Sequence, residues 1–262
     1  MIEKKMIKKH LLTCSVILVL TIIFQLSFGD TETHRKPRNT PRNYAFISYE
    51  NSPKNTLNFA NEELPADRNV NGKMRRSLRL HSFSNVGSEV LQRKAEIMFP
   101  IIEPILLAYG IPDDFKFIPL VESGFGEGKS TRGAYGPWQF MAGTARTYGL
   151  HVNKHRDERL DIAKSTVAAC KYLLELHQEF KSWTLVAAAY NTGSPNLARL
   201  IHQQREHNYF RIKMNSETGR YVYNLIAMKQ IINDPQKYGY SSYKPLYAYV
   251  SGFSNNNAIA FN

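Results

Sequence analysis

Cysteine is almost absent from this sequence, with 2 residues among 262. Cys14 lies in an apolar run near the N-terminus, which leaves Cys170 as the single cysteine of the remaining chain. A lone cysteine cannot close an internal disulfide, so a disulfide-stapled fold is excluded and packing must stabilise the core. A chain of this length with 43% hydrophobic residues can bury a core of ordinary size.

Acidic residues are scarce relative to basic ones. The chain has 22 Asp and Glu against 34 Lys and Arg, a formal net charge of +12. A basic surface suits an anionic partner such as a cell-wall polymer, a lipid headgroup or a nucleic acid. Nucleic-acid binding is disfavoured among these, because the basic residues are not interleaved with aromatics in a known binding motif.

Metal-ligand spacing is also missing. The histidines do not form a pattern such as H-E-x-x-H, and we expect them to be ordinary surface or packing residues. The sequence therefore predicts neither a metal nor another cofactor. The histidines concerned are His151, His155, His177, His202 and His207.

The first 29 residues are typical of an export signal. A basic start, MIEKKMIKKH, precedes the apolar run LLTCSVILVLTIIFQLSFG, and Ser27 and Gly29 are small residues where a signal peptidase cuts. We expect cleavage after Gly29. An uncleaved membrane anchor over residues 11–29 is the alternative, because the run is near spanning length. Either outcome predicts an exported protein of the periplasm or cell envelope.

Convincing alternating strands are absent from the central region, and helical spacing is present there instead. We expect one all-α domain of about six to eight helices at residues 86–240. Residues 30–85 show no sustained period and are expected to be a linker or N-terminal extension. Its basic run, KMRRSLRL, is either a solvated segment or a contact to an anionic wall or membrane. Residues 241–262 are expected to be a polar, frayed tail.

The helix boundaries are predicted from caps and breakers. The first helical pattern begins near Ser88, is interrupted by prolines and stops at Gly110. Three further helices are expected. One has Pro112 at its first helical position, one begins near Ser165 with an amphipathic pattern, and one begins at Ser182 and ends at Gly193. The residues that carry these signals are Pro100, Pro104, Pro112, Ser165, Ser182 and Gly193.

Glu122 interrupts an apolar stripe in the segment FIPLVESGFG. On a helix, Phe115, Ile118, Glu122 and Phe125 share one face, so a carboxylate occupies a position where the pattern favours an apolar residue. Burial raises the pKa of a carboxyl group, and a carboxyl that stays protonated near neutral pH can act as a general acid. A purely structural glutamate that caps amides or pairs with Lys129 or Arg132 remains open from this feature alone.

Two later motifs are rich in groups that bind sugars. GAYGPWQFMAGTA offers aromatic faces and an amide, and AAAYNTG places Tyr190 and Asn191 at a helix end beside a glycine. The alternative for the first motif is a loop that plugs the core.

Taken in order, these motifs resemble those of lytic murein transglycosylases. VESGF, GAYGPWQFMAGTA, YGLHVNKHRDERLD, STVAACKYL, AAAYNTG and ETGRYV stand in the order and spacing of the lysozyme-like catalytic domain of that family. The similarity runs from about Ala95 to Tyr238 and is closest to the membrane-bound transglycosylase D subgroup. The resemblance implies cleavage of the β-1,4 bond between N-acetylmuramic acid and N-acetylglucosamine in peptidoglycan, with a 1,6-anhydro-muramyl end as product.

The resemblance also implies roles for individual residues. Glu122 matches the single catalytic acid, and Glu217 matches a glutamate expected to orient Tyr190. Six further residues are expected near the acid or the sugar: Ser130, Gln139, Met141, Tyr190, Asn191 and Tyr221. The expected partners are peptidoglycan strands, with the membrane or other cell-wall enzymes as further candidates and no nucleic acid.

Some positions depart from the family pattern. Ala142 stands where proline is usual, and the chain ends too early for the LysM wall-binding repeats that relatives commonly carry. Two other functions stay open at this point. They are a hydrolytic muramidase of the same fold, which uses water as nucleophile, and a non-catalytic wall-binding protein.

Overall fold

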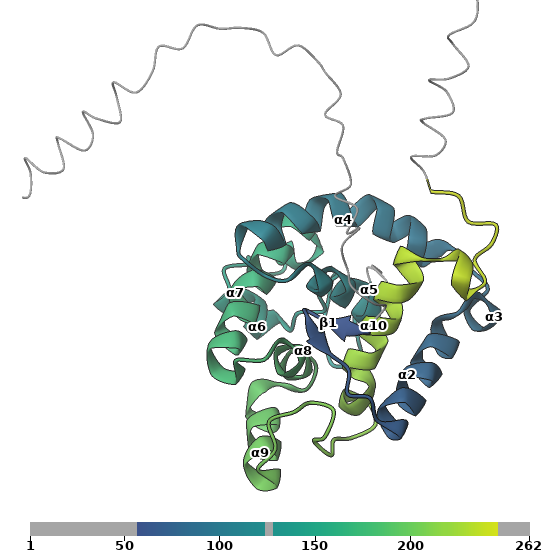
Figure 1. Cartoon of the computed structure of the whole chain (residues 1–262). Helices are drawn as coiled ribbons and strands as arrows, with labels where there is room; N and C mark the ends of the chain where they lie inside the picture. The colour runs from purple at the N-terminus through teal and green to yellow at the C-terminus, as the bar shows by residue number, and fades with distance from the viewer. Residues whose placement is uncertain (1–56, 124–127, 246–262) are drawn as a thin grey trace, which may run out of the picture. The chain divides into compact units, whose positions relative to one another are not determined.

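The computed structural model describes residues 57–123 and 128–245. Two units separate along the chain, Met1–Ser52 and Pro53–Asn262, and every described residue belongs to the second. Helices dominate this part of the chain (Figure 1). The predicted all-α fold is therefore confirmed, with a two-stranded hairpin as its only sheet within the described residues.

The elements follow one another along the chain with short connections. Antiparallel β1 and β2 pair Asn58 with Glu63 and Phe59 with Glu62. The α-helices are α2 (Arg68–His81), α3 (Phe83–Val86), α4 (Val90–Ala108), α5 (Ile118–Ser123), α6 (Ala142–Thr147), α7 (Ile162–Phe180), α8 (Trp183–Thr192), α9 (Ser194–Gln204) and α10 (Thr218–Asn233). The strands are β1 (Asn58–Phe59) and β2 (Glu62–Glu63), and the 3-10 helices are η1 (Asp113–Phe117), η2 (Glu158–Leu160) and η3 (Gln236–Tyr238).

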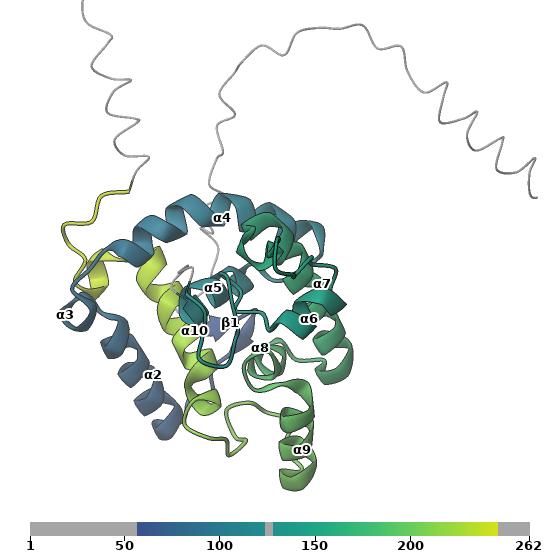
Figure 2. The ribbon, with the colours of Figure 1, turned by 180° about the vertical axis from the view of Figure 1, so that it is seen from behind.

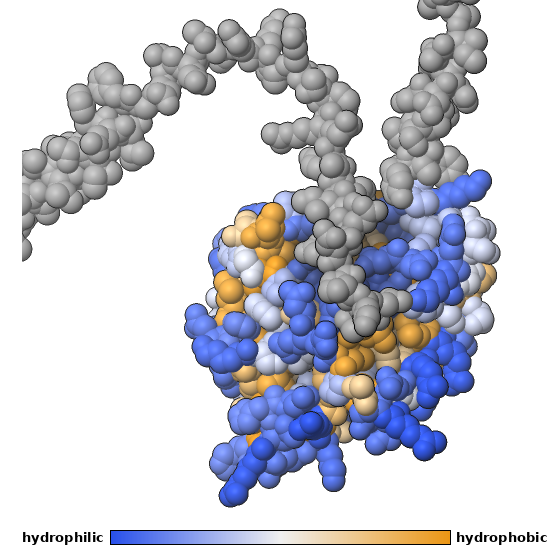
Figure 3. Space-filling view, viewed as in Figure 1, coloured by the Kyte–Doolittle hydropathy of each residue, from blue (hydrophilic) through white to orange (hydrophobic). Residues whose placement is uncertain are grey.

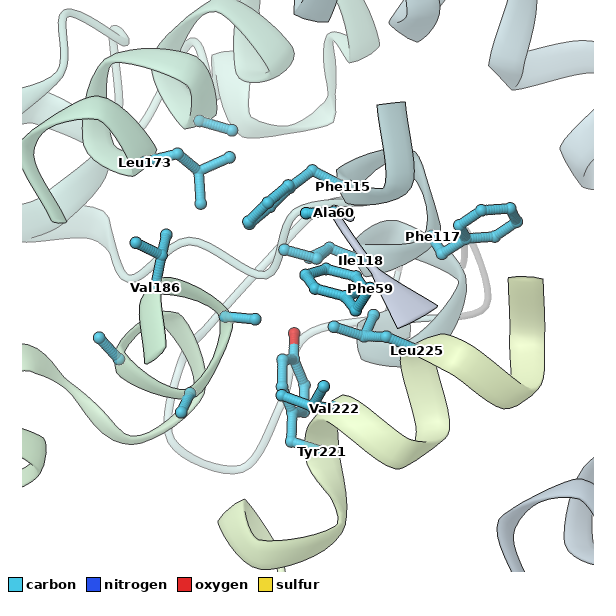
Figure 4. Close-up of a cluster of buried hydrophobic side chains, with 14 of the residues drawn as sticks. Phe59, Ala60, Phe115, Phe117, Ile118, Leu173, Val186, Tyr221, Val222 and Leu225 are labelled. Carbon is cyan, nitrogen blue, oxygen red and sulfur yellow. The ribbon is translucent and has the colours of Figure 1, made fainter. Parts of the chain in front are cut away.

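Helix α8 is the centre of the core. Its residues from Thr184 to Ala189 are all buried, and alanines at three consecutive positions let neighbouring helices approach closely. Helices α7, α9 and α10 pack on α8, while α4 covers α7 and η1. Figure 4 shows how side chains from β1, η1, α5, α7, α8 and α10 meet in one cluster.

Local capping explains where the central helices start and end. Ser182 accepts a hydrogen bond from the Leu185 amide at the start of α8, and Gly193 ends that helix at φ 86°, as predicted. Helix α7 begins at Ile162 rather than near Ser165, because the Asp161 carboxylate caps it by accepting from the Lys164 amide.

The prolines of α4 do not interrupt it. We expected breaks at Pro100 and Pro104, yet α4 runs without interruption from Val90 to Ala108. Both prolines are exposed on its outer side, where a bend and missing amide hydrogen bonds can be tolerated.

The segment expected to be a linker is structured from residue 57 onward. Helix α2 packs along α10, as Figures 1 and 2 show from opposite sides, and Ser77 donates a hydrogen bond to Asn224 at 2.8 Å. The apolar stripe of α2 is Val70 and Met74 with small Ser77. Helix α2 was not predicted from the sequence, because its apolar stripe is short and lies among basic residues.

The C-terminal boundary of the domain also differs from the prediction. Tyr243 is buried and its ring lies 4.8 Å from the Arg93 guanidinium, so the fold extends past the predicted end at residue 240. The predicted signal or anchor at residues 1–29 lies outside the described residues. Among the described helices, none is both long and apolar enough to cross a membrane.

Glu62 of the hairpin locks the N-terminus of α8. Its carboxylate accepts hydrogen bonds from the Trp183 and Thr184 amides, and from the Ser182 and Thr184 hydroxyls at 2.8 and 2.6 Å. An acidic group at a helix N-terminus also interacts favourably with the helix dipole. The hairpin is therefore a structural part of the helical domain.

Substitution of Glu62 by glutamine is expected to lower the free energy of unfolding by about 1–2 kcal/mol, because an amide replaces a charged acceptor of four hydrogen bonds. Urea unfolding followed by circular dichroism measures this change. Glu63→Gln is the matched control, since Glu63 is exposed, and should change stability by less than about 0.5 kcal/mol. Equal effects of the two substitutions would contradict the capping role.

Candidate active site

Glu122 lies in the last turn of α5, after the buried residues of that helix. Pro119 has no amide hydrogen and stands in the first turn of α5, so the segment is a 3-10 helix followed by a short α-helix. Phe115 and Ile118 are fully buried below, as the stripe predicted, and Glu122 is half-buried. Phe125 and Glu127 lie outside the described residues.

The pKa of Glu122 is raised above its ordinary value. Burial is the largest cause, and the negative charge of Glu217 adds to it, while a hydrogen bond from Tyr221 acts in the opposite direction. The raised pKa expected from the sequence is confirmed. Pairing with Lys129 or Arg132 does not occur among the described residues, so a neutral donor is the partner of this carboxyl group.

Tyr221 is that donor. Its hydroxyl donates to Glu122 Oε1 at 2.6 Å, and the side chain is 4% exposed in the first turn of α10. Figure 4 shows its ring among the core side chains, with the hydroxyl pointing away from α10. Tyr221 was expected to line the sugar site. That role stays a prediction, and the structure shows in addition that the Tyr221 hydroxyl binds the acid.

Tyr190 lies close enough to the acid to be affected by its charge, and it belongs to an aromatic cluster. Its hydroxyl donates to the Trp138 carbonyl at 2.7 Å, and its ring centroid lies 5.5 Å from that of Tyr172. Burial raises the pKa of Tyr190 well above its ordinary value, and the nearby Glu122 charge adds to this rise. Tyr190 therefore stays a protonated donor close to Glu122.

Glu217 is not the residue that orients Tyr190. It is exposed, it directly precedes α10, and the hydroxyl of Tyr190 is already engaged by a main-chain carbonyl. Its effect is electrostatic, since like charge disfavours ionisation of Glu122. The expected Glu217–Tyr190 contact was wrong, because order along the chain does not say which tyrosine a glutamate reaches.

The aromatic motif is divided between the core and the surface. Trp138 and Phe140 are buried, and the Trp138 indole donates to Thr166 at 3.0 Å, so these two rings plug the core. Met141 is 46% exposed. Gln139 has φ 48° and its amide donates to the Gly136 carbonyl at 2.8 Å, which turns its side chain away from the buried rings. Of the residues predicted to bind sugar in this motif, Gln139 is partly exposed and Met141 is exposed.

Ser130 and Asn191 differ in what they do locally. Ser130 is exposed, and its hydroxyl accepts from the Ala134 amide at 2.9 Å, which closes a turn. The Asn191 Oδ1 atom is buried and has no hydrogen-bond partner within the described ranges. Buried polar atoms are rarely left unpaired, so this unused acceptor of Asn191 is an exception, and its role in binding sugar stays a prediction.

Arg159 holds the aromatic motif in place, and the sequence reasoning missed it. Its guanidinium binds Asp157 through two donors at 2.9 and 2.6 Å and donates to the carbonyls of Gly133 and Phe140 at 3.1 and 3.0 Å. Only 4% of Arg159 is exposed. The motif DERLD places this arginine among acidic residues, and that pattern was the available signal for a buried arginine. A buried guanidinium requires paired acceptors.

Gly136 sits directly against the Arg159 backbone. A Cβ atom at this position would lie 2.0 Å from the Arg159 carbonyl oxygen, and φ is +79°. Gly136→Ala is therefore expected to lower the free energy of unfolding by about 3 kcal/mol, through overlap and left-handed strain. Gly143→Ala is the control, because Gly143 lies in α6 with open space, and should raise stability by about 0.5–1 kcal/mol. Denaturant titration of both variants checks the opposite signs.

Comparison with known proteins shows what this chain is similar to. Residues 104–212 match the model of the family described as Transglycosylase SLT domain. Membrane-bound lytic murein transglycosylase D of Escherichia coli (strain K12) is 30% identical over 135 residues, which is 49% of this chain and 30% of that protein. A putative tributyltin chloride resistance protein of Alteromonas sp. (strain M-1) is 31% identical over 93 residues, 35% of this chain and 45% of that protein.

The chain thus spans less than half the length of these relatives. The family match includes Glu122, Gln139, Tyr190 and Arg159, and it ends before the tyrosine that binds the acid. The half-buried acid and the helical fold thus stand in a chain whose residues 104–212 match the Transglycosylase SLT domain and which is similar to a lytic murein transglycosylase.

Proposed function

We propose that this protein is a peptidoglycan lytic transglycosylase. The proposed reaction cleaves the β-1,4 bond between N-acetylmuramic acid and N-acetylglucosamine and leaves a 1,6-anhydro-muramyl end. The observation that carries the proposal is the half-buried Glu122, whose pKa is raised and whose carboxyl group accepts a hydrogen bond from Tyr221. The family match and the printed name of the Escherichia coli relative support it.

In the first step, Glu122 donates its proton to the glycosidic oxygen. The bond between that oxygen and C1 of the muramyl sugar breaks, and the electron pair leaves with the departing sugar as a hydroxyl group. Burial supports this step because it keeps the carboxyl group protonated. The Tyr221 hydroxyl stabilises the carboxylate that forms, since a donor favours the charged acceptor.

In the second step, the Glu122 carboxylate acts as a base. It takes the proton of the muramyl C6 hydroxyl, whose oxygen attacks C1 and closes the anhydro ring. The carboxyl group is thereby restored to its protonated form. One carboxyl group serves both steps, whereas hydrolytic glycosidases ordinarily use two.

A hydrolytic muramidase would replace the C6 hydroxyl by water. Such an enzyme would ordinarily use a second carboxyl group. Glu217 is the carboxylate whose charge acts on Glu122, but it is exposed and precedes α10. A non-catalytic wall-binding protein would have no need for a carboxyl group held in its protonated form. Neither alternative is favoured by the family match.

We also propose a location in the cell envelope. The Escherichia coli relative is named as membrane-bound, and the sequence begins with a basic and then apolar segment typical of export. Peptidoglycan strands are the proposed partner.

Glu122→Gln is expected to lower the rate of wall digestion by about 10²- to 10⁴-fold, because the amide cannot donate a proton to the leaving oxygen. Mass spectrometry of soluble muropeptides from purified sacculi measures the effect, and wild-type products should carry anhydro-muramyl ends. Reducing ends alone would show hydrolysis, and digestion at the wild-type rate would show that Glu122 is not the acid.

The same variant should fold at least as stably as the wild type at neutral pH. A raised folded-state pKa contributes stability below the unfolded pKa, and this contribution is lost as pH rises through the folded pKa. Glutamine does not ionise, so the variant avoids this loss of stability at neutral pH. The stability difference between the variant and the wild type should therefore shrink as the pH falls. Loss of activity with retained stability therefore separates chemistry from misfolding.

Two substitutions are expected to move the pH profile of digestion in opposite directions. Activity falls at high pH when Glu122 loses its proton. Tyr221→Phe removes a hydrogen bond that lowers the pKa, so this limb should shift to higher pH. Glu217→Gln removes a charge that raises the pKa, so the limb should shift to lower pH. Rates measured across pH with soluble glycan strands test both signs, and shifts in one common direction would contradict the assignment.

A further inference from the structure

The outer face of α2 carries a row of arginines. Arg68, Arg75 and Arg79 recur at steps of seven and four residues, so they share the face opposite the buried Val70 and Met74. Arg76 stands beside this row, and all four arginines are exposed. Figure 3 shows strongly hydrophilic residues on the right-hand side of the molecule, where Figure 1 places α2.

No acidic residue balances this face. Helix α2 contains neither Asp nor Glu, and the Asp67 carboxylate that precedes it is occupied in capping the Asn69 and Val70 amides. The four arginine side chains form no ion pair with any described residue. Like charges three and four residues apart destabilise a helix, so α2 retains a repulsion that an anionic partner would relieve.

A hollow lies along the same helix. Its volume is about 490 Å³, it is open to solvent, and its lining combines basic or polar side chains with apolar ones. An anionic headgroup between two guanidinium groups, with apolar atoms below it, fits this lining. The lining residues are Leu57, Arg68, Asn71, Met74, Arg75 and Leu78.

Exposed apolar side chains occur in the last turn of α2 and on the two helices that follow it. Leu80 is 47% exposed, Val86 at the end of α3 is 37% exposed, and Val90 at the start of α4 is 53% exposed. Basic residues beside exposed apolar ones are the combination that binds the interface of an anionic bilayer. A polymer that carries only carboxylates gives no reason for the apolar part.

We propose that this face, defined by Arg68, Arg75, Arg76 and Arg79 with the adjoining Leu80, binds the phosphate headgroups of an anionic phospholipid bilayer. The residues concerned take no part in the Glu122 site, so the inference does not depend on the reaction proposed for it.

Hydrogen–deuterium exchange of the full chain tests the proposal. The amides of α2 are followed with vesicles of phosphatidylcholine alone and with vesicles that also contain phosphatidylglycerol. Exchange in α2 should slow only on the anionic vesicles and should recover in high salt. Each basic residue near such a surface contributes about fivefold to association, so R68Q/R75Q/R79Q should raise the anionic lipid needed for half-maximal protection by about 100-fold.

The matched control removes the same charge elsewhere. K171Q/R211Q/K213Q changes three exposed basic residues outside α2 and should keep the protection. The two triple variants share the rest of the chain, so the difference between them reports on α2. Melting curves should show the α2 variant to be no less stable than the wild type, because the substitutions relieve repulsion.

Four outcomes would overturn the proposal. They are equal protection by neutral and anionic vesicles, equal loss in the two triple variants, protection by purified sacculi but not by vesicles, and protection by inorganic phosphate at the same ionic strength. The third outcome would assign the face to wall carboxylates, and the fourth to a free phosphate site.

Discussion

The hydrogen bond from Tyr221 to Glu122 is the interaction on which the site depends. It joins residues 99 positions apart, one at the end of α5 and the other in the first turn of α10. Burial of Glu122 raises its pKa. The Tyr221 hydroxyl gives the buried carboxylate a hydrogen-bond partner when the proton is absent. The rest of the domain keeps these two helices in register: α8 packs against α10, and the hairpin holds the start of α8.

Two further groups keep the surrounding shell in place. Arg159 fixes the loop of Gly133 to Phe140 from one side, and the Trp138 carbonyl of that loop receives the Tyr190 hydroxyl. Lys229 of α10 binds Asp114 at 2.7 Å, and the same carboxylate accepts from the Ala60 amide, so the hairpin, η1 and α10 meet at one ion pair. Such paired, partly buried charges are costly to break from one side.

Helical periodicity and capping residues predicted much of this fold, because both are local properties. Glu122 could be found from its own segment, since it interrupts an apolar stripe. The role of Tyr221 could not, because a hydrogen bond between distant segments leaves no trace in spacing. Trp138 was ambiguous for a related reason: an aromatic residue after a glycine can bind a ligand or fill a core. Helix α2 was overlooked because its buried stripe is short and its charge dominates the pattern.

The long separation between the groups that meet in the site has a consequence for when activity can arise. Glu62 is synthesised early, yet its hydrogen-bond partners on α8 follow about 120 residues later. The tyrosine that binds the acid follows later still. An incompletely synthesised chain therefore has Glu122 without the groups that support it. The site is complete only when nearly the whole domain has been made and folded, so the order of the chain itself delays its assembly.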